Sequence, residues 1–179
     1  MLENNNSVQK YSKLAFWIFS ILLLVVMPIL SKDFGQSGDE DVEILYGQDI
    51  YNYFFNGDPA ALYYPEDVRS PLQHLYGGMF NYIAELIHHI FPSWHIVDIR
   101  HFLGSICGAI LMIFTGLLCY EIGNKKWHLG LLGLLFIAFS PRIFGESMFN
   151  SKDIPYAMSF VMTIYYLLLL ISSLKNNKK

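Results

Sequence analysis

Long apolar runs without charge alternate with charged connections along this chain. The first run, residues 14–30, follows Lys10 and Lys13 and has seventeen residues, enough to cross a bilayer when its flanks help. It is longer than the apolar core of a secretory signal and no small-x-small cleavage site follows it, so we expect an anchor and not a cleaved signal peptide. Three further runs predict helices of the same kind at residues 102–121, 128–144 and 156–174. The pattern predicts an all-α membrane protein with about four transmembrane helices.

Basic residues predict how these helices are oriented. They concentrate in three short segments at residues 1–13, 122–127 and 175–179. By the positive-inside rule these segments are cytoplasmic, and both termini with them. Segments 31–101 and 145–155 then form two outer loops, and the outer side carries thirteen of the fifteen acidic residues, all but Glu3 and Glu121. A composition rich in Asn, Lys, Ile and Tyr favours an AT-rich bacterium, and therefore a bacterial inner membrane.

The first outer loop is too long to be a passive linker. Within it, residues 75–91 repeat apolar side chains at a helical period, interrupted by Glu85, His88 and His89. We expect an amphipathic helix that lies in the membrane interface. Residues 49–55 predict a second short helix before an Asn-Gly-Asp-Pro turn. The two adjacent histidines lack the i, i+4 spacing of a helical metal site, so we interpret them as interfacial polar residues.

A dense acidic block opens this loop, in the stretch SGDEDVEILYG. Its four carboxylates are Asp39, Glu40, Asp41 and Glu43. Like charges this close repel one another, which raises the pKa of at least one group and makes it a candidate general base. The alternative is an acidic loop that merely stays hydrated.

Charged residues elsewhere on the outer side offer further candidates. The second outer loop carries Arg142, Glu146, Lys152 and Asp153. Asp153 also suits the N-terminus of the helix that follows, so a simple capping loop is the alternative there. Arg69, in the turn before the interfacial helix, has the planar fork that binds a lipid phosphate, but it could equally pair with Glu66 or Asp67.

Composition supports the membrane class and excludes several others. Hydrophobic residues make up 54% of the 179 positions and charged residues 15%, with a formal net charge of -3. Cys107 and Cys119 lie twelve apart in one apolar run, which argues against a disulfide or metal pair. No Gly-rich phosphate loop, HExxH or CxxC motif is present. There is no clustered basic patch, so nucleic acid is not an expected partner.

Taken in order, these pieces resemble the N-terminal part of the polyprenyl-phosphate-sugar-dependent glycosyltransferases of the GT-C fold. Protein O-mannosyltransferases and lipid A aminoarabinose transferases are the most similar members. The likeness rests on the Asp39-Glu40 pair, the turn at Ser70-Pro71-Leu72, the Ser140-Pro141 turn, and the stretch from Asn150 to Pro155. Members of that family usually have eleven or more spans. We therefore expect a partial GT-C fold, with the missing spans supplied by further sequence or by a C-terminal companion chain.

The resemblance implies an inverting transfer of a sugar from a polyprenyl-phosphate donor to a hydroxyl of a protein, lipid or glycan. Asp39 or Glu40 would act as the general base. Binding of the donor phosphate and the acceptor would fall to Arg69, Arg142, Lys152 and Asp153. Asp39, Asp41 and Asp153 offer the oxygen ligands that Mg²⁺ or Mn²⁺ prefers, although family members differ in metal need.

The alternative from another class is a non-enzymatic membrane subunit, or a fragment of a transporter, with an acidic loop that binds a partner. Transporters place ionisable groups within their spans. Here the central parts of all four predicted spans are uncharged and the acids lie outside them. This distribution favours the transferase.

Overall fold

The computed structural model describes residues 2–62 and 77–176, and all the regular structure in these ranges is helical. The helices in chain order are α1 (Leu2–Leu30), the short 3-10 helix η1 (Ser31–Asp33), α2 (Glu40–Phe55), α3 (Met79–Ile90), α4 (Ile96–Ile122), α5 (Trp127–Ala138), α6 (Pro141–Phe149) and α7 (Asp153–Asn176). The all-α prediction is confirmed. The described helices extend past several predicted ends, and α2 begins nine residues before the expected Asp49.

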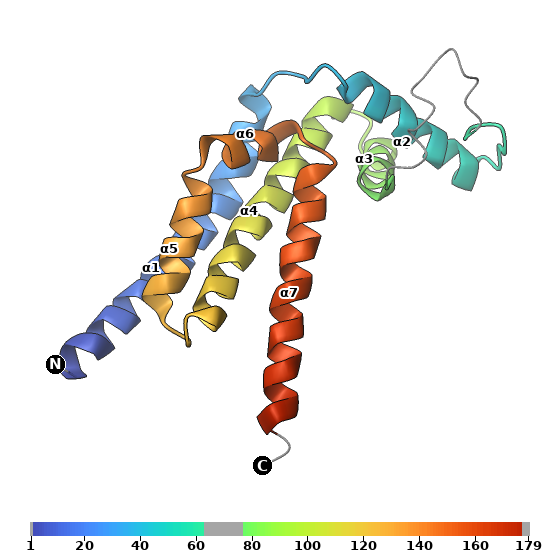
Figure 1. Ribbon diagram of the computed structural model, residues 1–179. Coiled ribbons are helices and arrows are strands. Elements are labelled where there is room, and N and C mark those ends of the chain that lie inside the picture. The colour runs from blue at the N-terminus through green and yellow to red at the C-terminus, as the bar shows by residue number, and fades with distance from the viewer. Residues whose placement is uncertain (1, 63–76, 177–179) are drawn as a thin grey trace.

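Figure 1 shows α1, α4, α5 and α7 running alongside one another, with α2, α3 and α6 gathered at one end of this bundle. Both termini lie at the opposite end, as does the turn between α4 and α5. The central helix is α4, which packs against α1, α5, α6 and α7. The described parts of the two segments predicted to be outer loops therefore lie at the same end of the bundle.

Three helices are long and apolar enough to cross a membrane, over Asn6–Asp33, Ile96–Ile122 and Asp153–Lys175. A fourth crossing, expected as one helix over residues 128–144, is broken instead. Helix α5 ends at Ala138, and α6 starts at Pro141 at an angle of 66° to it. Proline fits the first turn of a helix because it has no N–H to leave unpaired, but it cannot continue the preceding one.

Small residues on α4 allow its neighbours to approach closely. A Cβ added at Gly116 would lie 2.8 Å from the carbonyl oxygen of Gly130 in α5, and one at Gly108 would overlap the side chain of Ser147 in α6. This is the packing expected of helices within a bilayer, where small side chains permit backbone contact. The apolar core around these contacts includes Phe16, Met27, Ala109, Met112, Leu134 and Met148.

Candidate functional site

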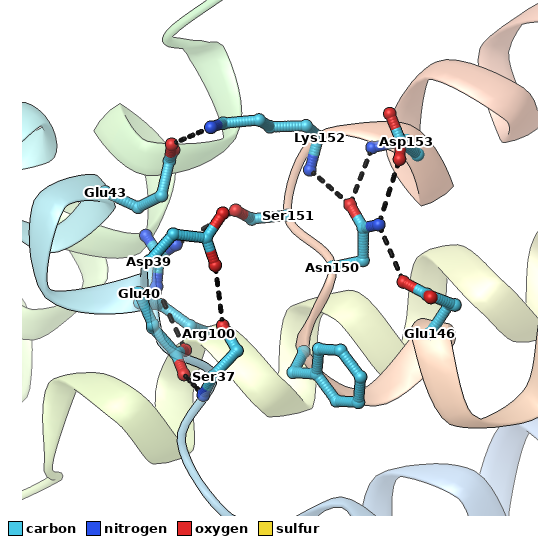
Figure 2. A pocket seen from close by; sticks show the side chains of 11 residues that line it. Ser37, Asp39, Glu40, Glu43, Arg100, Glu146, Asn150, Ser151, Lys152 and Asp153 are labelled. Atoms are coloured by element: carbon cyan, nitrogen blue, oxygen red, sulfur yellow. Dashed lines mark hydrogen bonds and ion pairs between the residues drawn. The ribbon is translucent and has the colours of Figure 1, made fainter. Parts of the chain in front are cut away.

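A polar pocket of about 240 Å³ opens at the end of the bundle where α2, α3 and α6 gather. One wall is the chain leading into α2, and the other is the connection from α6 to α7 (Figure 2). Its lining residues are Ser37, Asp39, Glu40, Glu43, Arg100, Glu146, Phe149, Asn150, Ser151, Lys152 and Asp153. The structure thus brings together the acidic block and the second outer loop, which lie about a hundred residues apart in the sequence.

Arg100, in the second turn of α4, joins the two walls through its guanidinium group. Its Nε donates to Glu40 Oε1 at 3.3 Å, one terminal nitrogen donates to Asn81 Oδ1 at 2.8 Å, and the other to Ser151 Oγ at 3.0 Å. Its side chain is 2% exposed. Through these three hydrogen bonds, Arg100 of α4 connects α2, α3 and the loop before α7.

Sequence reasoning did not single out Arg100 or its neighbour His101. The available signal was an Arg-His pair at the start of an apolar run, because an ionisable residue in such a segment normally has a partner. The partner could not be identified, since Glu40 is sixty positions away. Asn81, in the predicted interfacial helix, gave no separate signal.

Glu40 lies deeper than a hydrated acidic loop would place it, with 1% of its side chain exposed. Besides Arg100, its contacts are His101 Nε2, 3.2 Å from Oε2, and the Ser37 N–H, which donates to Oε2 at 3.2 Å. Burial acts to raise the pKa of Glu40, but the hydrogen bonds and the positive charges around it prevail, so its pKa is lowered. Glu40 is therefore a charged carboxylate whose oxygens are already engaged.

Asp39 differs from Glu40 although it is the next residue. It is exposed, and its Oδ1 accepts a hydrogen bond from Ser37 Oγ at 3.0 Å. It precedes α2 directly and lines the pocket. Of the two candidate bases, Asp39 is the carboxylate that a substrate can reach.

Glu43 and Lys152 form a bridge between the two walls of the pocket, seen at the top of Figure 2. Lys152 Nζ lies 2.5 Å from Glu43 Oε1, and Asn81 Nδ2 donates to Glu43 Oε2. The Glu43 side chain is buried, whereas that of Lys152 is 30% exposed. Lys152 can therefore contact both a substrate and the acidic block.

Asn150 shapes the loop that carries Lys152. Its side-chain oxygen accepts hydrogen bonds from the backbone N–H groups of Lys152 at 3.1 Å and Asp153 at 2.8 Å. Its amide nitrogen donates to Glu146 Oε2 at 2.8 Å and Asp153 Oδ2 at 3.1 Å. The loop is thus a hydrogen-bonded turn at the start of α7, consistent with the capping role predicted for this stretch. It also presents side chains to the pocket.

Two predicted site residues, Arg142 and Asp41, do not line this pocket. Arg142 is 87% exposed and lies 4.0 Å from Glu146 on its own helix. Asp41 is exposed and accepts a hydrogen bond from Gln36. Arg69 and the Ser70-Pro71-Leu72 turn lie outside the described residues. Among the described residues no group of three or more His, Cys, Asp or Glu side chains could hold a metal ion, so the metal ligands stay a prediction.

An apolar groove of about 510 Å³ continues from the polar pocket. The two share Ser151, Lys152 and Asp153. The rest of the groove is lined by Gly77, Met79, Phe80, Ile83, Cys107, Pro155, Tyr156, Met158 and Ser159. Met158 and Ser159 also line a shallower hollow that follows α7 as far as Leu170. A charged pocket therefore passes into an apolar path along α7.

Near the site, α3 carries a third buried carboxylate, and one of its two oxygens has no hydrogen-bond partner among the described residues. Glu85 is 4% exposed, with Oε1 3.3 Å from His89 Nδ1, whereas Oε2 has no hydrogen-bond partner among the described residues. Burial raises the pKa of Glu85, and the opposing pull of His89, His88 and Arg100 does not cancel this effect. The charged form of Glu85 thus destabilises the folded protein.

We expect Glu85→Gln to raise the free energy of unfolding at pH 8 by about 0.5–2 kcal/mol, the usual gain from a single stabilising substitution, because the neutral amide avoids the cost of charging a buried acid whose pKa is raised. An acid whose pKa is raised by folding is least favourable at high pH, so the advantage shrinks as pH falls through the folded pKa. Below the ordinary pKa of glutamate it disappears. Thermal unfolding in detergent at several pH values measures this. The control is Asp33→Asn, an exposed carboxylate; a gain independent of pH would contradict the explanation.

Comparison with known proteins gives one distant similarity. The chain is 28% identical over 107 residues to Protein A43 of variola virus (isolate Human/India/Ind3/1967), and the same values hold for a second variola virus Protein A43. The alignment covers 59% of this chain and 53% of the relative, so the chain spans about half the length of the curated relatives it matches. No family model matches, and no solved structure matches. The name Protein A43 states no activity.

Proposed function

We propose that this chain forms the N-terminal helices of a GT-C membrane glycosyltransferase, which moves a sugar from a polyprenyl-phosphate donor to a hydroxyl acceptor on the outer side of a bacterial inner membrane. Its four crossings, with α5 and α6 as one broken span, would leave both termini in the cytoplasm. The observation that carries this proposal is the continuity of the polar pocket with the apolar groove through Ser151, Lys152 and Asp153. A donor with a hydroxylated head, an anionic link and a hydrocarbon tail matches that sequence of surfaces.

Charge within the site suggests how such a donor would lie. Glu40 is paired with Arg100, and Glu43 with Lys152. The further acidic side chains of the pocket are Asp39, Glu146 and Asp153. Carboxylates accept hydrogen bonds from sugar hydroxyls but repel a phosphate. The sugar therefore belongs in the pocket, and the phosphate belongs beside Lys152, where pocket and groove meet.

In the proposed reaction, Asp39 accepts the proton of the acceptor hydroxyl as that oxygen forms a bond to the anomeric carbon. The bond from the anomeric carbon to the phosphate oxygen breaks, and its electron pair leaves with the polyprenyl phosphate. Attack and departure on opposite faces invert the configuration. Lys152 stabilises the charge that develops on the phosphate, and it does so at the edge of an apolar region where such a contact is stronger than in water. Asp153 would hold the acceptor.

Photocrosslinking to a polyprenyl phosphate tests the donor site. We expect p-benzoylphenylalanine at Ser159, which lines the groove, to crosslink to undecaprenyl phosphate in nanodiscs, and unlabelled polyprenyl phosphate to compete. The matched control is the same substitution at Phe160, an exposed neighbour on α7 that lines neither the groove nor the hollow. Equal labelling from both positions, or no competition, would reject the donor site.

One observation favours the alternative of a non-enzymatic subunit. None of the most apolar stretch of α7 is buried, so partner helices have room to pack on it. In that case the acidic end of the bundle would bind a partner protein, and α7 would crosslink to protein rather than to polyprenyl phosphate. The same two benzoylphenylalanine positions distinguish the two functions.

A further inference from the structure

A second pocket, of about 630 Å³, lies where α1 ends and α4 begins, and it shares no lining residue with the polar pocket or the groove. It is lined by Pro28, Ile29, Lys32, Ser93, Trp94, His95, Asp98 and Phe102. Its volume is within the range of small-molecule sites. These residues come from the end of α1, from η1, from the connection between α3 and α4, and from the first turns of α4.

The pocket combines both signs of charge with an aromatic ring. Lys32 and Asp98 are exposed, and among the described residues the structure records no ion pair or hydrogen bond for either side chain. Trp94 is 52% exposed, and its ring is packed against Phe102 at 6.3 Å and Phe91 at 6.0 Å between centroids. A cation, an anion and an anchored indole face are therefore available to one ligand.

Its place in the chain determines which ligands reach it. Lys32 is the last basic residue of the apolar segment Asn6–Asp33, and Asp98 lies near the start of the segment Ile96–Ile122. If these segments cross the membrane, the pocket lies at the level of the lipid headgroups, where tryptophan and lysine are favoured. Ile29 and Phe102 contribute apolar surface to the lining of the same pocket.

We propose that this pocket binds a zwitterionic phospholipid that carries a primary ammonium group, as phosphatidylethanolamine does. Lys32 binds the phosphate. Asp98 accepts hydrogen bonds from the ammonium group, which also lies over the Trp94 ring. The glycerol and upper acyl chains run along Ile29 and Phe102. An anionic lipid without an amine gains the contact with Lys32 but meets repulsion from Asp98. This inference does not depend on the proposed glycosyl transfer.

Native mass spectrometry of the purified protein tests the pocket, with equal amounts of phosphatidylethanolamine and phosphatidylglycerol added. We expect phosphatidylethanolamine to be retained roughly two- to fivefold more, a ratio within the range of one exposed charge pair. Asp98→Asn should remove this preference, and Lys32→Gln should lower the retention of both lipids. The matched control is Asp33→Asn, beside Lys32 but outside the pocket lining, which should keep the preference.

Fluorescence of Trp94 gives an independent readout that also reports correct folding. The chain has three tryptophans, so Trp17→Phe together with Trp127→Phe leaves only Trp94. Headgroup-proximal brominated phosphatidylethanolamine should quench its emission more than the matching phosphatidylglycerol does, and Asp98→Asn should equalise them. Equal retention of the two lipids by the unmodified protein, or an unchanged preference in a folded Asp98→Asn variant, would overturn the proposal.

Discussion

Replacing Arg100 with alanine is expected to lower the free energy of unfolding by about 3–5 kcal/mol, the cost of leaving a buried charge without its partner. Arg100 has a side chain that is 2% exposed, and it bonds to Glu40, Asn81 and Ser151. Without it, the partners of the buried Glu40 among the described residues are His101 and the Ser37 N–H. Thermal or denaturant unfolding in detergent measures the loss.

Two further variants show whether charge or geometry is responsible. Arg100→Lys keeps the charge but loses the planar fork that reaches three partners, so we expect a smaller but clear loss. Arg142→Ala removes an arginine that is 87% exposed, and we expect a change within about 0.5 kcal/mol. Similar effects at Arg100 and Arg142 would contradict the role of the buried network.

Replacing Asp39 with asparagine is expected to reduce sugar transfer by about 10²- to 10⁴-fold, the usual contribution of a general base. This prediction rests on the proposed function. Because Asp39 is exposed and its described contact is with Ser37, the variant should unfold at nearly the same temperature as the unmodified protein. The measurement is transfer of a radiolabelled sugar from a polyprenyl-phosphate donor, with this chain in the complete membrane enzyme.

The matched control is Asp41→Asn, two positions away in the same acidic block. Asp41 is exposed but does not line the pocket, so its variant should retain transfer. Loss of transfer in both variants would indicate a general effect of charge in the loop rather than a base at Asp39. Normal transfer by Asp39→Asn would exclude it as the base.

Local patterns were sufficient to predict an all-α chain and the approximate places of α1, α3, α4 and α7, because apolar periodicity and length reflect burial segment by segment. For the span expected over residues 128–144 they indicated a turn at Ser140-Pro141 but not a second helix, whereas Pro141 starts α6 at an angle of 66° to α5. They left open whether Glu40 is a general base or part of a hydrated acidic loop, whereas in the structure its environment is set by Arg100 and His101 of α4. A charge pair sixty residues apart leaves no trace in a local pattern.

The residues of the candidate site could be predicted from the sequence only in part, because a local pattern shows which charges lie beside an apolar run but not which of them meet in space. Lys152 and Asp153 stand out as charges next to an apolar run, and the structure places both in the pocket with Asp39. Arg142 has the same local appearance, but it is 87% exposed and does not line the pocket, although Glu146 on the same face of α6 does. Only the packing of α6 and α7 against α4 separates these cases.

The break between α5 and α6 also affects the surrounding lipid. Twelve residues of α5 rise only about 18 Å, whereas the hydrocarbon layer is about 30 Å thick. If α5 starts at the inner boundary of this layer, its outer end lies within the layer, and we expect the neighbouring leaflet to thin toward the polar residues of α6. A lipid-borne reactant that diffuses toward this side would enter a locally thinner bilayer. Its headgroup would therefore move a shorter distance along the membrane normal to reach the polar residues of α6.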